Sequence, residues 1–201
     1  RLQFLLDRQD AGKELTQTGS LRRESFNWKL IRIAAAAARA AGAEVRLLDP
    51  ADLDLPLFSE DREHSGGMPP AAQRFKRALV EAQGFLIASP EYNASLSAAL
   101  KNAIDWASRT EAPGEPPLLA FQGRPAALFS ASPGALGGLR GLVHLTLVLQ
   151  NLRVFVLPEQ RALGRAHEAF DADGTLRDKA VEAHVGRLAG QLVDSVRRLS
   201  N

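Results

Sequence analysis

The sequence predicts an α/β fold in which helices cover both faces of a parallel sheet. Short apolar runs alternate along the chain with segments whose apolar residues recur every three or four positions, and this alternation is typical of β-α-β units. The chain has 201 residues, of which 45% are hydrophobic and 24% are charged, as in ordinary globular proteins. Because this length suits one domain with a substantial core, and nothing in the sequence looks like a linker, we expect residues 1–201 to form a single domain.

Five segments have the residue spacing of a helix. In the last one, Val181, Val185 and Leu188 begin an apolar repeat that continues to Leu199, which is typical of an amphipathic helix on a sheet. Gly42 supplies a helix end, and Pro70 a helix start. The predicted helices are Ser25–Ala41, Pro70–Ala82, Ser97–Ala107, Leu139–Leu149 and Val181–Leu199.

Short apolar runs between these helices predict the strands. They are Val45–Leu48, Phe85–Ala88, Pro125–Ser130 and Val154–Leu157. The polar segment Asp52–Pro69, which contains glycine and proline, is expected to be a loop.

The first strand is poorly marked in the sequence. A parallel strand buried on both faces should be a continuous apolar run, whereas Lys13–Thr18, directly before Gly19, is polar. Arg1–Leu6 would suit a strand, but it lies about a dozen residues too early for a short turn. Either Lys13–Thr18 forms a poor strand, or the strand is displaced with an insertion behind it.

Composition and charge argue against several classes of protein. The absence of cysteine excludes disulfide scaffolds and thiolate chemistry, and it agrees with a cytoplasmic location. No apolar run approaches the roughly 20 residues of a membrane span, and Arg1–Leu6 is too short for a signal-peptide core. The 25 basic and 23 acidic residues are scattered, so nucleic-acid binding is not expected. The four histidines lack the spacing of metal ligands, so no metal site is expected.

The stretch Gly19–Asn27, which opens the first predicted helix, has the residues of a phosphate-binding turn. Gly19 permits a tight turn, Ser20 and Ser25 offer hydroxyl groups, and Arg22 offers a forked cation for an oxyanion. Free amides at the helix start add further donors. The alternative is that Ser25 caps the helix and the arginines are solvated.

Two further stretches follow predicted strands. In Ser89–Asn93, proline stiffens a loop that contains the only tyrosine, Tyr92, whose ring could stack on a ligand. The glycines of Ser132–Gly138 would allow close backbone approach to a planar group, although their order is not that of the dinucleotide fingerprint. Open α/β sheets bind ligands at the carboxyl ends of their strands, which all three stretches follow. Ordinary turns remain the alternative reading of both loops.

Together these stretches resemble the NAD(P)H-dependent FMN reductase family, which includes flavodoxin-like quinone, chromate and azo-dye reductases. The resemblance is carried by GSLRRESFN (19–27), SPEYNASLSAALKNAIDWASR (89–109) and GRPAALFSASPGALGGLRG (123–141), and it covers roughly residues 19 to 200. Residues 1–18 do not match the family, which has a short apolar strand before the Gly-Ser turn.

The resemblance implies a flavodoxin-like three-layer sandwich, with five parallel strands in the order 2-1-3-4-5 and helices on both faces. It implies FMN as cofactor, NADPH or NADH as co-substrate, and a homodimer or homotetramer. The residues implied to hold FMN are Ser20, Arg22, Ser25 and Asn27 at the phosphate, Pro90, Glu91, Tyr92 and Asn93 along the ring and ribityl chain, and Ser132, Gly134, Gly137 and Gly138 on the other side of the ring.

For such a site we expect hydride transfer from NADPH or NADH to flavin N5, followed by two-electron reduction of a quinone, chromate, an azo compound or free flavin. No catalytic side chain is expected, because the sequence lacks a nucleophile elbow. Two alternatives stay open. One is a flavodoxin-like electron carrier, against which the net charge of +2 argues because such carriers tend to be acidic. The other is a non-catalytic member whose altered first strand prevents FMN binding.

Overall fold

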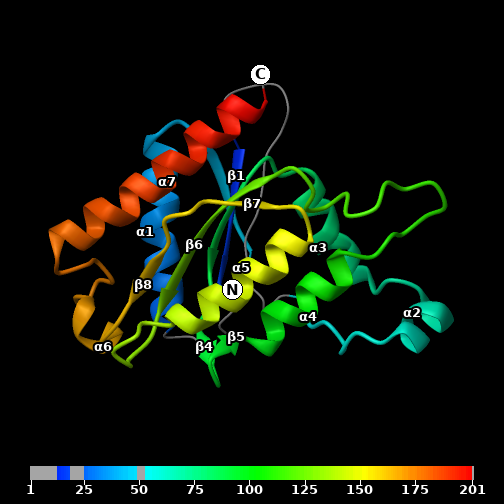
Figure 1. The fold of residues 1–201 in the computed structure, drawn as a ribbon, viewed down its shortest axis with the longest axis horizontal. Coiled ribbons are helices and arrows are strands. Elements are labelled where there is room, and N and C mark those ends of the chain that lie inside the picture. Colours follow the sequence, from blue (N-terminus) through cyan, green and yellow to red (C-terminus); the bar gives the residue numbers. More distant parts are fainter. Residues whose placement is uncertain (1–12, 19–24, 49–52, 201) are drawn as a thin grey trace.

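A parallel sheet forms the centre of the molecule in the computed structural model, which describes residues 13–18, 25–48 and 53–200 (Figure 1). Its strands lie in the order β2-β1-β3-β6-β7. The short strand β8 pairs with the later part of β6, whereas β7 pairs with the start of β6. All these pairings are parallel. The strands are β1 Lys13–Thr18, β2 Glu44–Leu47, β3 Phe85–Ala88, β6 Pro125–Ala131, β7 Phe155–Val156 and β8 Arg161–Leu163.

The polar stretch Lys13–Thr18 forms an inner strand, β1, which lies between β2 and β3. Leu15 pairs with Phe85 of β3 and Thr18 pairs with Ala88, while Lys13 pairs with Glu44 of β2. The first strand therefore ends directly before Gly19 in the sequence, and Gly19 and Arg1–Leu6 lie outside the described residues.

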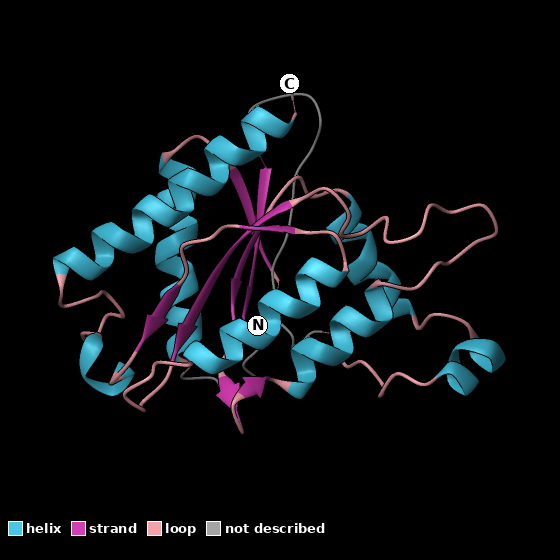
Figure 2. Ribbon diagram, in the orientation of Figure 1, coloured by secondary structure: helices cyan, strands magenta, loops and turns pink. Residues whose placement is uncertain are grey.

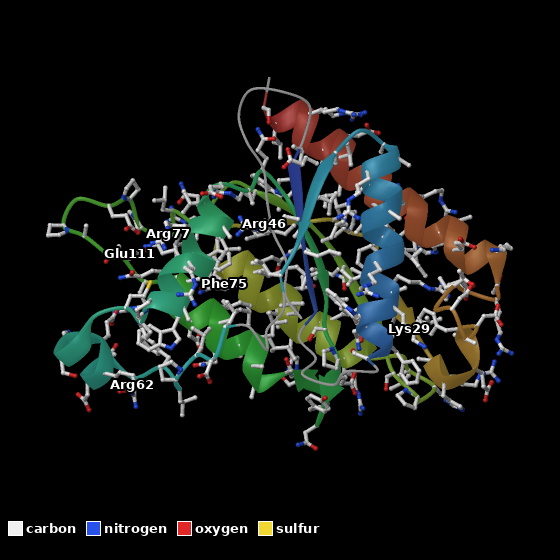
Figure 3. All side chains as sticks on the ribbon, turned by 180° about the vertical axis from the view of Figure 1, so that it is seen from behind. Lys29, Arg46, Arg62, Phe75, Arg77 and Glu111 are labelled. Carbon is white, nitrogen blue, oxygen red and sulfur yellow. The ribbon has the colours of Figure 1, made fainter. Side chains whose placement is uncertain are left out.

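Helices cover both faces of the sheet (Figures 1 and 2). On one face, α1 Phe26–Ala40 and α7 Lys179–Leu199 pack on each other through buried small and aliphatic residues such as Ala34 and Leu188. On the other face lie α3 Pro70–Val80, α4 Ala98–Ala107 and α5 Leu139–Asn151, with Phe75 pointing into the core (Figure 3). The parallel α/β architecture and these five helices confirm the sequence prediction.

The expected loop Asp52–Pro69 contains a helix, α2 Glu60–Gly66, so that prediction was wrong. Ser59 caps the helix by accepting from the Arg62 amide at 3.2 Å, and Gly67 ends it with φ +67°. None of the seven described residues of α2 is buried, so the helix has no apolar face and leaves no periodic pattern in the sequence.

The last strand also differs from the sequence prediction. The predicted run Val154–Leu157 contributes only Phe155 and Val156 to the sheet, and β8 follows after Pro158. The short helix α6 Ala166–Ala169 and the hairpin of β4 Glu91–Tyr92 and β5 Ser95–Leu96 were not predicted either. All of these elements are too short to produce a repeat of apolar residues in the sequence. Separately, the described helices include none with the length and hydropathy of a membrane span.

Candidate functional site

The three predicted ligand-binding stretches follow neighbouring strands, so they begin at the same side of the sheet, where the carboxyl ends of the strands lie. β1 ends at Thr18, which pairs with Ala88 at the end of β3, and Ala88 pairs with Phe129 near the end of β6. We call the stretches Ser89–Asn93 and Ser132–Gly138 the edge loops. Ser20 and Arg22, predicted at the phosphate, lie outside the described residues.

At the start of α1, Ser25 and Asn27 are both buried and hydrogen-bonded. The Ser25 hydroxyl accepts from the Trp28 amide at 3.4 Å, which makes Ser25 the N-cap of α1. The Asn27 side chain donates through Nδ2 to the Ala131 carbonyl and accepts through Oδ1 from the Ala131 amide, both at 2.8 Å. Asn27 therefore fixes the start of α1 against the last residue of β6, where the second edge loop begins.

A carboxylate joins the first edge loop to the start of α5, which directly follows the second edge loop. Glu91 accepts from Arg140 Nε at 2.9 Å and from the Gly141 amide at 3.1 Å, and its side chain is only 9% exposed. Gly141 lies in the first turn of α5, so the carboxylate caps the positive end of that helix. Burial by itself raises the pKa of Glu91, but the hydrogen bonds from Arg140 and Gly141 outweigh burial and hold the pKa below its ordinary value.

The first edge loop has a fixed base and an exposed tip. Ser89 and Pro90 are buried, and the Ser130 hydroxyl donates to the Ser89 carbonyl at 2.7 Å. Asn93 and Ala94 both have positive φ, as a two-residue type I′ hairpin requires. Beside them the Tyr92 ring is 52% exposed, so the ring stands in solvent on a rigid hairpin.

Two buried glycines give the second edge loop its shape. Gly137 and Gly138 have φ of +64° and +92°. A Cβ atom at Gly138 would lie 1.9 Å from Ser130 Oγ, and one at Gly137 would lie 2.5 Å from the Gly164 nitrogen. Side chains are thus sterically excluded at both positions. In contrast, Gly134 at the tip is exposed, and a Cβ atom there would meet only Ser132 Oγ, at 3.8 Å.

The end of β8 supports the second edge loop from behind. The Ser132 amide donates to the Leu163 carbonyl at 3.1 Å, and the Ala166 amide donates to the Ser132 carbonyl at 3.0 Å. A Cβ atom at Gly164 would lie 2.4 Å from the Ala135 carbonyl oxygen. The backbone of the second edge loop therefore packs directly on the backbone of residues 163–166.

Four residues of this arrangement were missed in the sequence: Ser130, Arg140, Gly141 and Gly164. Arg140 and Gly141 adjoin the second edge loop, so their presence near it could have been expected. Their partner Glu91 lies about 50 residues earlier, and no pattern in the sequence reveals that pairing. Gly164 stands alone in the sequence and carries no signal.

The rest of the 89–109 motif supports a different segment, residues 53–66, which we call the arm. Asn102 of α4 accepts from the Phe58 amide at 2.8 Å and donates to the Pro56 carbonyl at 3.0 Å. Trp106 Nε1 donates to the same carbonyl at 2.8 Å, and Arg109 pairs with Glu63 at 2.8 Å. α4 and the residue just beyond its end therefore hold the arm.

The chain is similar to proteins of one family along most of its length. Residues 15–168 match the family model described as NADPH-dependent FMN reductase. An NAD(P)H-dependent FMN reductase of Pseudomonas aeruginosa is 38% identical over 189 residues, which cover 93% of this chain and 96% of that protein. A quinone reductase of Pseudomonas putida is 36% identical over 176 residues, covering 85% and 89% of the two chains.

A solved structure of similar fold is FerB, a flavoenzyme NAD(P)H:(acceptor) oxidoreductase from Paracoccus denitrificans. It superposes with a TM-score of 0.75 at 30% sequence identity, covering 90% of this chain and 94% of FerB.

Proposed function

We propose that this chain, which belongs to the NADPH-dependent FMN reductase family, uses FMN to reduce quinones or similar small oxidants with NADPH or NADH. The assignment as a reductase rests on the family match and on relatives whose names describe FMN and quinone reductases. We further propose that the whole chain is one flavodoxin-like domain, in which β7 and β8 together take the place of the fifth strand in the order 2-1-3-4-5.

The single observation that best supports a flavin site is the contrast between base and tip in the edge loops. Their bases are buried, and hydrogen bonds from Ser130 of β6 and Gly141 of α5 fix the first loop to the elements on either side of the second. Tyr92, Asn93 and Gly134 at the tips are exposed. A fixed backbone that presents exposed polar and aromatic groups at the carboxyl edge suits a flat, polar ring.

We assign two roles to the predicted site residues. Those proposed to contact FMN are Ser20, Arg22 and Ser25 at the phosphate, and Pro90, Tyr92, Asn93, Ser132 and Gly134 beside the ring and ribityl chain. A Ser25 hydroxyl that accepts from Trp28 still has its own hydrogen to donate to a phosphate oxygen.

The remaining four residues, Asn27, Glu91, Gly137 and Gly138, are proposed to hold the loops in place. The carbonyl oxygen of the Asn27 amide is already bonded to Ala131, and the Glu91 carboxylate is bonded to Arg140 and Gly141. Both side chains connect segments that are distant in sequence, so each fixes the geometry of the site through other residues.

When bound, FMN would supply the redox chemistry, the transfer of two electrons from the nicotinamide to the acceptor. The chain's own residues would bind the cofactor and orient it. The start of α1 presents backbone amides and the positive end of the helix dipole toward a phosphate. The start of α5, at Gly138, faces the same edge of the sheet, where a helix N-terminus favours negative charge.

The test is an absorbance spectrum of the purified protein after incubation with FMN and desalting. We expect flavin absorbance to be retained, to bleach when NADPH or NADH is added without oxygen, and to return when a quinone is added. Loss of all flavin on desalting would indicate the non-catalytic alternative. A stable semiquinone on titration, with slow reduction by both nicotinamides, would indicate the electron carrier.

A further inference from the structure

Arg165, which follows β8 by two residues, has an uncommon backbone conformation beside the second edge loop. Its φ is +47° and its ψ is +42°, in the left-handed region that favours glycine and asparagine over other residues. The Arg165 amide donates to the Gly134 carbonyl at 3.3 Å, and a Cβ atom at the preceding Gly164 would lie 2.4 Å from the Ala135 carbonyl oxygen. The backbone at residue 165 is therefore held against the tip of the second edge loop.

Neither packing nor pairing explains the arginine side chain at this position. Arg165 is exposed, and within the part of the chain that the structure describes its guanidinium has no ion pair and no hydrogen bond. The nearest acid in the sequence, Glu168, lies instead 3.1 Å from His167 Nε2. A backbone that would suit glycine thus carries a long cationic side chain whose charge is left for solvent or for a ligand.

This charge stands next to loop tips that are otherwise neutral. The edge loops contain one charged residue, Glu91, and its carboxylate is paired with Arg140. Tyr92 and Gly134 at the tips are exposed. A molecule bound at the tip of the second edge loop would therefore lie beside Arg165, whose planar fork of N–H donors suits the oxygens of an anion.

We propose that Arg165 is a specificity-determining residue, whose guanidinium binds an anionic group of the substrate at the second edge loop. The group is either a sulfonate, carboxylate or oxyanion on the oxidant, or a phosphate of the nicotinamide dinucleotide, because both present charged oxygens to the fork. The inference rests on the proposed function only for the place where substrates bind. It predicts that a negative charge on the substrate favours its reaction with this chain.

The first experiment compares naphthoquinone with naphthoquinone sulfonate, which share a ring system and differ in charge. Arg165→Gln should lower kcat/KM about tenfold for the sulfonate and leave it within about twofold for the neutral quinone. Arg165→Lys keeps the charge without the fork and should lose about threefold or less for the sulfonate. High salt should weaken the wild-type preference for the sulfonate and leave Arg165→Gln unaffected. An equal loss for the two quinones would overturn a role in specificity.

The second experiment identifies which substrate carries the anion. NADPH and NADH are compared with reduced nicotinamide riboside, which has no phosphate, at a saturating concentration of neutral naphthoquinone. A loss in Arg165→Gln for the two dinucleotides but not for the riboside supports a nicotinamide phosphate, whereas a loss for the sulfonate alone supports the oxidant. Weaker retention of FMN with unchanged binding of riboflavin would place Arg165 at the cofactor phosphate and overturn the proposal.

Arg77→Gln is the matched control. It removes the same charge from an exposed position on α3, which lies on the opposite side of the sheet from α6 (Figure 1), and it should leave every ratio within about twofold of the wild type. Circular dichroism checks that all variants are folded.

Equilibrium dialysis against naphthoquinone sulfonate and NADP⁺, each alone and without reductant, measures binding without turnover. Arg165→Gln should bind the ligand that carries the recognised anion about tenfold more weakly than the wild type does. The proposed function fails if flavin is lost on desalting or is not bleached by either nicotinamide. The present inference fails, whatever the flavin does, if Arg165→Gln binds both ligands as Arg77→Gln does.

Discussion

The edge loops and the arm both lie outside the central sheet, but they are held by different chemistry. The edge loops are fixed by backbone contacts around buried glycines and by the Glu91 carboxylate, which bonds to the start of α5. The arm is fixed by three side chains: Asn102 and Trp106 on α4, and Arg109 just beyond the end of that helix. The arm carries α2 away from the body of the molecule, with Arg62 at its outer side (Figure 3).

The different ways in which the two segments are held indicate different roles for the edge loops and the arm. Backbone packing around Gly138 leaves no room for adjustment, and it leaves the groups at the loop tips free to meet a ligand. On the arm, backbone groups such as the Pro56 carbonyl and the Phe58 amide are already satisfied by α4. We therefore expect changes in the edge loops to affect FMN binding and changes at the arm to affect stability alone.

The largest effect is expected for Gly138→Ala. The new Cβ atom would overlap Ser130 Oγ, and alanine is strained at φ +92°. We expect a loss of about 3 kcal/mol or more in the free energy of unfolding, together with loss of retained FMN. Urea unfolding and flavin absorbance measure the two effects. Gly134→Ala is the control for stability, because its Cβ atom meets only Ser132 Oγ at 3.8 Å, and a cost equal to that of Gly138→Ala would contradict the steric argument.

The next effect is expected for Asn102→Ala at the arm. The change leaves the Phe58 amide and part of the Pro56 hydrogen bonding without a partner, so we expect a loss of about 2 kcal/mol in the free energy of unfolding. FMN affinity should be unchanged, as measured by quenching of flavin fluorescence. Lys101→Ala, which removes only an exposed pair with Asp105, should change stability by less than about 0.5 kcal/mol.

Glu91→Gln should have an intermediate effect on stability, of about 1–2 kcal/mol at pH 7, because it removes the charge from the bonds to Arg140 and Gly141. The native pKa of Glu91 is lowered, so the stability that this carboxylate contributes is present above its unfolded pKa, about 4.5, and is lost as pH falls through the native value. The difference between wild type and variant should shrink as the pH is lowered below that range. A difference that grows toward acid pH in urea titrations would contradict the assignment.

The smallest effect is expected for Ser59→Ala. An N-cap serine typically contributes about 1 kcal/mol to its helix. Because none of the described residues of α2 is buried, we expect that loss to stay local and to change global stability by less than about 0.5 kcal/mol. Hydrogen exchange at the Arg62 amide should speed up, whereas exchange in α4 should not. A global loss near 2 kcal/mol would show that α2 is part of the cooperative core.

Sequence reasoning predicts the parts of this fold that bury a regular apolar face. The α7 helix follows from its repeat, and β3 follows from Phe85–Ala88, all four of which are buried. It fails where an element buries no apolar face, as in α2. It also leaves β1 undecided, because Lys13–Thr18 is not a continuous apolar run. The three ligand stretches could be found from their places after strands, but the pairing of Glu91 with Arg140 depends on tertiary packing.

The central claim is that the edge loops shape the FMN site while the arm does not. The most direct test compares FMN dissociation constants of Glu91→Gln and Asn102→Ala with that of the wild type, at pH 7 and in conditions where all three are folded. We expect Glu91→Gln to weaken FMN binding about tenfold and Asn102→Ala to leave it within about twofold, although Asn102→Ala is the less stable protein. Equal weakening in both variants, or none in Glu91→Gln, would contradict the account.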